Sequence, residues 1–144
     1  MSWANVRGAM VDSIEALTPS SRAHDTYRNV DVGMAEEQPK LRGFDVRVVT
    51  GPAQVGQIVN GTEWRWLTSC EVIVYYPRLR SRATMEQLIS EDVVQLQQTL
   101  LQLGNHHANV EGIVPDGEGY ITPSWDYDEV GNAVVAVPLT IHHL

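Results

Sequence analysis

Histidine and cysteine side chains are the residues of this sequence best suited to hold a metal ion. The five histidines include the adjacent pairs His106-His107 and His142-His143, and the single cysteine is Cys70. Neighbouring residues of an extended chain point to opposite sides, so neither pair chelates a metal by itself. Cys70 has no second cysteine for a disulfide and no basic neighbour to activate its thiol, which predicts a small core residue. We therefore expect no metal and no cofactor.

Two further spacings begin like ligand-binding loops but lack the residues that complete them. Asp126, Asp128 and Gly131 match the start of a calcium-binding loop, but valines occupy its fifth and twelfth positions, where oxygen ligands are needed. Gly51 and Gly56 have phosphate-loop spacing without the lysine and hydroxyl that follow in such loops. No nucleophile elbow is present, and the acids do not define an acid–base pair. We predict that the protein is not an enzyme and has no catalytic residues.

Arginine and carboxylate side chains are the remaining candidates for a functional role, which would be the recognition of a charged partner. The chain has 144 residues and a formal net charge of −8. Residues 1–82 contain all ten basic residues and nine acidic ones, whereas residues 83–144 contain nine acidic residues and no Lys or Arg. Because nucleic-acid binding depends on Lys and Arg neutralising phosphates, this acidic chain is a poor candidate for gripping DNA or RNA.

The charge distribution predicts a contact between copies of the chain. Three closely spaced cations, Arg78, Arg80 and Arg82, end the basic part of the sequence. We expect them to face acids of a neighbouring copy, because complementary charges orient an interface. The candidate acids are Glu86, Glu91, Asp92, Asp126, Asp128 and Glu129. The alternative is that the arginines belong to a solvated loop.

Hydrophobic periodicity predicts the elements that position these residues. Apolar residues at spacings of three and four indicate two helices, over residues 2–17 and over residues 84 to about 103. Thr84 and Gln87 fit a capping box at the start of the second helix. Alternation indicates strands over 44–50, 55–59, 63–76, about 120–127 and 133–142, with a short strand around 26–32. Residues 18–43 and 105–119 are predicted to be mainly loops. This order predicts one α+β domain over residues 1–144, with an antiparallel sheet of about four to five strands and two helices on one face.

A projecting hairpin is predicted within this sheet. Gly51-Pro52 is expected to interrupt the first long strand, and Asn60-Gly61 is a strong signal for a tight turn. Residues 51–62 would then form an arm that reaches beyond the sheet. The residues assigned to this arm are Gln54, Val55, Gln57, Ile58, Asn60 and Gly61.

The sequence gives no indication of a membrane partner. It has no run of about 18 apolar residues, and its first residues lack the continuous apolar region of a signal peptide. We expect a chain made in the cytoplasm.

The order of elements resembles a protein family. The resemblance rests on the helix WANVRGAMVDSIEAL, the strand FDVRVVTG followed by a hairpin, the strand EWRWLTSCEVIVYYP leading into the helix MEQLISEDVVQLQQTLLQL, and the closing hairpin GYITPSWDYDEVGNAVVAVPLTIHHL. In this pattern the chain resembles the tail terminator proteins of long, non-contractile-tailed bacteriophages and the related minor tail and tail-completion proteins. The resemblance covers nearly the full length and depends on pattern and order, without a motif of fixed residues.

The resemblance implies a structural virion protein made in the host cytoplasm. It would form a homo-oligomeric ring, expected to be a hexamer, that caps the tail tube and joins it to the head-completion or connector protein. DNA would only pass through the ring. One alternative is another head–tail adaptor or minor tail protein. The other is a small α+β enzyme, whose pocket would hold at least two titratable groups with strongly shifted pKa values.

Overall fold

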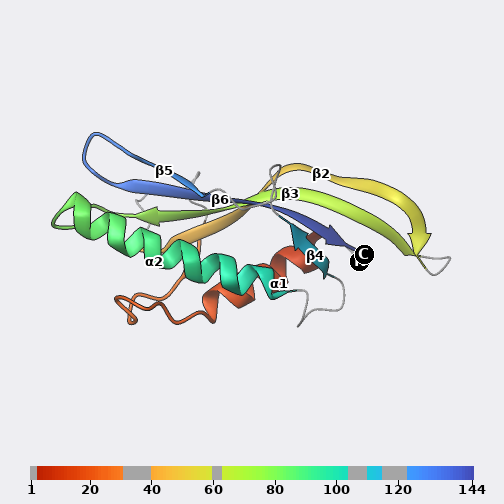
Figure 1. The fold of residues 1–144 in the computed structure, drawn as a ribbon, viewed down its shortest axis with the longest axis horizontal. Helices are drawn as coiled ribbons and strands as arrows, with labels where there is room; N and C mark the ends of the chain where they lie inside the picture. Colours follow the sequence, from red (N-terminus) through yellow and green to blue (C-terminus); the bar gives the residue numbers. More distant parts are fainter. Residues whose placement is uncertain (1–2, 31–39, 60–62, 104–109, 115–122) are drawn as a thin grey trace.

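The predicted α+β arrangement is confirmed by a computed structural model, in which both helices cover one face of a β-sheet (Figure 1). The structure describes residues 3–30, 40–59, 63–103, 110–114 and 123–144. The elements in chain order are α1 (Trp3–Glu15), β1 (Arg28–Asn29), β2 (Gly43–Val59), β3 (Glu63–Tyr76), α2 (Arg82–Leu101), β4 (Val110–Val114), β5 (Ser124–Tyr127) and β6 (Ala133–His143).

The sheet has a mixed topology. Its order is β1-β2-β3-β6-β4, and β5 also pairs with β6. β5 pairs with residues 133–136 of β6, and β4 pairs with residues 140–143 of the same strand. The two short strands therefore lie one after the other along β6. The expected all-antiparallel sheet is wrong at one pair, because β1 runs parallel to β2 through Arg28↔Gly43 and Asn29↔Phe44. The described residues form six strands, since the segment VEGIV in the predicted 105–119 loop forms β4.

The hydrophobic core lies between the helices and the inner face of the sheet. Alternate residues of β3 and β6 point inward, and the antiparallel register puts Val72 opposite Val137 and Val74 opposite Val135. Cys70 belongs to this face, and burial raises the pKa of its thiol to about 12, so the prediction of a core cysteine is confirmed. The helices supply the other side of the core with Val6, Met10, Ile14, Met85, Leu88, Ile89, Val93, Leu96 and Leu100.

Helix α2 begins earlier than its predicted capping box. Ser81 is the N-cap: its backbone is extended and its hydroxyl accepts a hydrogen bond from the amide of Thr84 at 3.1 Å. The predicted start at Thr84 is therefore wrong by three residues. As a result Arg82 is the first helical residue, and Arg78 and Arg80 lie in the short loop between β3 and α2.

Strands β2 and β3 extend past the rest of the sheet as a two-stranded arm (Figure 1). β6 ends opposite Trp66, whereas the β2–β3 pairing continues to Val59 opposite Glu63. Gly51-Pro52 does not end the strand as expected, because shifts in register at 48–50, 50–53 and 54–58 absorb the irregularity within one long strand. The Asn60-Gly61 turn lies outside the described residues.

Candidate functional site

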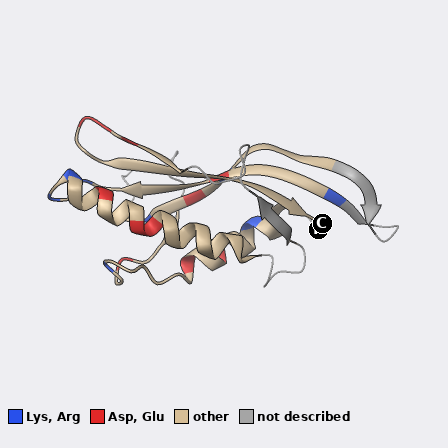
Figure 2. Ribbon diagram, viewed as in Figure 1, with Lys and Arg blue, Asp and Glu red and all other residues tan. Residues whose placement is uncertain are grey.

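The β3–α2 loop and the β5–β6 turn enclose a cleft at one end of the molecule. This end cleft has a volume of about 360 Å³. Its walls are Arg78, Leu79, Arg80, Ser81, Arg82, Met85, Tyr127, Asp128, Glu129, Val130 and Gly131. Figure 2 shows the basic residues on the loop side and acidic residues on the turn side. The two charge-biased parts of the sequence therefore meet within one chain.

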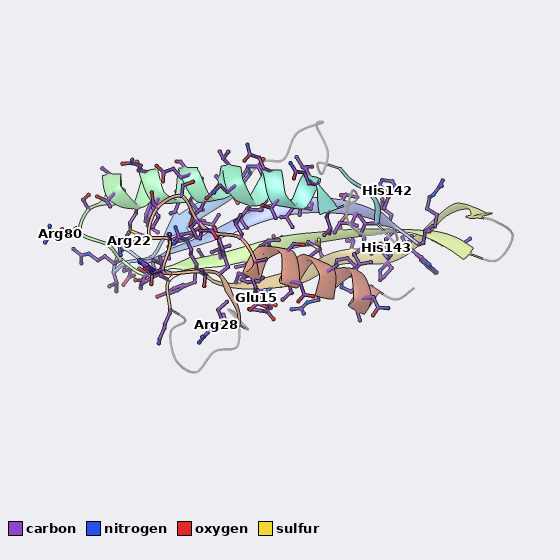
Figure 3. The ribbon with its side chains drawn as sticks, turned by 90° about the horizontal axis from the view of Figure 1, so that it is seen from below. Glu15, Arg22, Arg28, Arg80, His142 and His143 are labelled. Atoms are coloured by element: carbon purple, nitrogen blue, oxygen red, sulfur yellow. The ribbon has the colours of Figure 1, made fainter. Side chains whose placement is uncertain are left out.

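Two of the three cleft arginines are held in place. The guanidinium of Arg82 lies 4.2 Å from the centroid of the Tyr127 ring, in a cation–π contact. The backbone amide of Arg78 donates to the side-chain oxygen of Asn132 at 2.8 Å. The Arg78 stem crosses Gly131 so closely that a Cβ added at Gly131 would lie 3.3 Å from Cδ of Arg78. Arg80 is exposed at the tip, far from His142 and His143 (Figure 3).

Asp128 stabilises the β5–β6 turn, which forms the wall of the end cleft opposite the arginines. Its Oδ1 accepts hydrogen bonds from the backbone amides of Val130, Gly131 and Asn132 at 2.8–2.9 Å. Its Oδ2 accepts one from the side-chain amide of Asn132 at 3.0 Å. Desolvation opposes ionisation, but the hydrogen bonds from Asn132, Gly131 and Val130 outweigh it and lower the pKa of Asp128. Asp128 therefore shapes the cleft, and its carboxylate already has four donors.

The prediction that Asp92 faces a neighbouring copy is wrong. Asp92 is 0% exposed and forms a salt bridge with Arg42, whose Nε and Nη2 lie 2.7 and 2.9 Å from the carboxylate. The hydroxyl of Tyr76 donates to the same carboxylate at 2.7 Å. The sequence carried a signal for this burial, because Asp92 falls on the same helical stripe as Leu88, Ile89 and Leu96.

Arg42 is a central residue that sequence reasoning missed. Besides Asp92, its guanidinium donates to the backbone carbonyls of Ser21, Arg22 and Asp25 at 2.7–2.9 Å. Its backbone is left-handed, with φ of 61°. Burial, followed by the electrostatic interactions with Tyr27 and Asp92, raises the pKa of Tyr76 well above its ordinary value. This cluster ties the segment before β1 to α2, and its function is structural support.

The remaining predicted acids are distributed over several surfaces. Glu129 is exposed and lines the end cleft, whereas Glu86 on α2 and Asp126 on β5 are exposed and do not line it. Glu91 is half-buried and accepts hydrogen bonds from the Ser21 hydroxyl and, at 3.4 Å, from the Gln87 side chain. The structure thus brings the three arginines together with Asp128 and Glu129 of their own chain. Their pairing with a neighbouring copy stays a prediction.

The histidines do not form a metal centre in the described part of the chain. No group of three or more His, Cys, Asp or Glu side chains is placed there to hold an ion, and His106-His107 lies outside the described residues. His143 is 1% exposed; its Nε2 lies 2.9 Å from the Thr68 hydroxyl, and its ring lies 5.8 Å from that of Trp3. Burial lowers the pKa of His143, so the folded state protonates this ring less readily than the unfolded chain does.

We expect acidification to destabilise the fold through His143. Unfolded chains protonate histidine below a pKa of about 6.5, whereas the folded state resists protonation, so stability falls as pH drops below that value. Urea unfolding at pH 7.5 and 5.5 measures this loss. His143→Gln should reduce the difference between the two pH values, and the half-buried neighbour provides the control variant His142→Gln. An equal pH dependence in His143→Gln and the parent protein would contradict the assignment.

Comparison with known proteins does not assign the chain to a family. No protein-family model matches the chain, and no curated protein sequence matches it. Neither of the two helices among the described residues combines the length and hydropathy that a membrane span requires. Among the described residues the groups with strongly raised pKa values are Tyr27, Cys70 and Tyr76, which are all buried in the core, and none of them lines the end cleft. The functional argument therefore depends on the arm and the end cleft.

Proposed function

We propose that the protein is a structural virion component that assembles head to tail into a ring, expected to be a hexamer. The ring would cap the tube of a long-tailed phage and join it to the head-completion or connector protein. The observation that carries this proposal is the placement of two different surfaces at opposite ends of an elongated molecule. The arm lies at one end and the end cleft at the other (Figures 1 and 3).

A closed ring requires contacts of this kind. In a heterologous interface each copy uses one patch toward the preceding copy and a different patch toward the following one. A single self-complementary patch would give a two-fold dimer instead. The arm and the end cleft differ in shape and composition and lie far apart, which suits the heterologous case.

The two surfaces would contribute differently to assembly. Exposed ion pairs at the end cleft stabilise a contact by only about 0–1 kcal/mol each, so they would orient the copies more than hold them together. The apolar part of the interface is assigned to the arm, whose sequence includes Val55, Ile58 and Trp64. Assembly should accordingly become slower as salt rises, because salt screens the orienting charges.

Shortening the arm tests the proposal. In the variant, residues 55–65 are replaced by Asn-Gly, which joins the paired residues Gln54 and Trp66 through a two-residue turn. Light scattering over a concentration series should give the parent protein a mass close to six times the 16.0 kDa of one chain, and the variant the mass of one chain. Circular dichroism should show that both are folded.

Two outcomes would contradict the proposal. One is a parent protein that stays monomeric at every concentration and does not bind purified tail tubes. The other is a shortened variant that assembles as the parent does. Binding to the connector without binding to tail tubes would favour the head–tail adaptor alternative.

A further inference from the structure

The arginines of the end cleft are arranged to bind an anion. The guanidinium of Arg82 is stacked on Tyr127, whereas Arg78 is held through its backbone amide by Asn132 and along its stem by Gly131. Holding a guanidinium before its ligand arrives reduces the conformational entropy that binding would cost. Arg80 is exposed beside them and can close over a bound group. The stacked guanidinium of Arg82 and the exposed side chains of Arg78 and Arg80 therefore line the same cleft.

The other walls of the end cleft can accept the uncharged part of a ligand. Leu79, Met85 and the ring of Tyr127 provide apolar contacts. The hydroxyl of Tyr127 is buried and has no hydrogen-bond partner among the described residues. This hydroxyl is shielded from solvent, so the contact that Tyr127 offers a ligand in the cleft is its ring.

We propose that the end cleft is a binding site for carboxylate side chains of an acidic protein segment. Arg78, Arg80 and Arg82 would hold the carboxylates, because a guanidinium and a carboxylate form paired, charge-assisted hydrogen bonds. The methylene groups of a glutamate side chain would pack against Leu79, Met85 and the Tyr127 ring. A cleft of about 360 Å³ has room for one or two such side chains.

The acidic residues around the end cleft favour a protein carboxylate over a nucleic-acid phosphate. Glu129 lines the cleft, and Glu86 and Asp126 lie on the adjoining elements α2 and β5. A nucleic acid carries a charge at every nucleotide, so the strand leaving the cleft would meet these carboxylates. A peptide can place neutral residues on both sides of one glutamate and avoid this repulsion.

The source of the segment follows from the assembly. This assignment of the source rests on the proposed function, under which the segment belongs to the next copy in the ring. The choice of a carboxylate does not depend on it, because it follows from the walls of the cleft. The candidate acids are Glu86 and Asp126, which are exposed, do not line the cleft, and have carboxylates without a hydrogen-bond partner among the described residues.

Peptide titration tests the carboxylate site. The probes are a blocked six-residue peptide of alternating glutamate and alanine, the same peptide with glutamine in place of glutamate, and a six-nucleotide oligothymidylate. Each is titrated calorimetrically into the full chain at low salt, at a concentration where light scattering reports a monomer. We expect the glutamate peptide to bind and the other two to bind at least about tenfold more weakly.

Matched variants locate the binding. Arg80→Gln should weaken the glutamate peptide about tenfold, because it removes one charge-assisted contact. Arg28→Gln removes the same charge from an exposed residue of β1 and should change the affinity less than about twofold. If the ring persists at every concentration, the glutamate peptide should slow ring formation after dilution from urea, because it occupies the cleft that orients the copies.

The outcomes separate the cleft from the ring. Three results would overturn the carboxylate site: tighter binding of the oligothymidylate, equal effects of Arg80→Gln and Arg28→Gln, or, for a persistent ring, assembly that the peptide does not slow. A chain that binds the glutamate peptide but never assembles or joins tail tubes would support the site and refute the proposed function. A chain that assembles into a ring but whose monomer does not bind the peptide would support the proposed function and refute the carboxylate site.

Discussion

Asp92→Asn is expected to lower the free energy of unfolding by about 3–5 kcal/mol, the typical cost of leaving one member of a buried ion pair without its partner. The substitution keeps the shape of the side chain but removes the charge opposite Arg42, and both residues are 0% exposed. Arg42 also holds the carbonyls of Ser21, Arg22 and Asp25, so the loss should extend to the segment before β1. Urea unfolding followed by tryptophan fluorescence measures the change.

A second Arg–Asp pair provides the matched control for this prediction. Arg7 and Asp45 are 2.6 Å apart, close to the 2.7 Å of Arg42 and Asp92, but their side chains are 35% and 16% exposed. Water screens this pair, so Asp45→Asn should cost only about 0–1 kcal/mol. Equal losses in the two variants would show that burial does not set the contribution of the Arg42–Asp92 pair.

Gly51→Ala is expected to lower the free energy of unfolding by about 1–3 kcal/mol, the cost of holding a residue with a side chain in a rare backbone conformation. Gly51 has φ of 97°, a value that favours glycine. An added Cβ would also lie 2.6 Å from the carbonyl oxygen of Leu67 on β3, so the two strands would have to move apart. The loss should appear as a lower urea midpoint and as weaker protection of β2 and β3 amides in hydrogen exchange.

Gly8 is the control for the glycine prediction. It lies inside α1, and an added Cβ would meet no atom within 4 Å. Gly8→Ala should therefore stabilise the protein by about 0.5–1 kcal/mol, since alanine favours the helix. Changes of the same sign in the two variants would contradict the backbone explanation for Gly51.

The candidate site was only partly accessible from the sequence. Arg78, Arg80 and Arg82 were identified by their spacing, and the structure places all three around one cleft. The expectation that Asp92 faces a neighbouring copy was wrong, because Asp92 pairs with Arg42 of its own chain. The β5–β6 turn also brings Asp128 and Glu129 to the same cleft as the three arginines. Charge separation along a sequence does not predict charge separation in space when the two parts pair in one sheet.

By itself the sequence determined the α+β fold class, the two helices and the long strands β3 and β6. Helical and alternating periodicities are local properties, so they located α1, α2, β3 and β6 within a few residues. The residues around Cys70 likewise indicated that its side chain belongs to the core. Only the tertiary structure decided the parallel pairing of β1, the pairing of Arg42 with Asp92 and the joining of the arginines to the β5–β6 turn. These features depend on contacts between residues far apart in the chain, such as the 50 positions between Arg42 and Asp92. No local pattern encodes such a contact, because it exists only after the helices have packed on the sheet and excluded water.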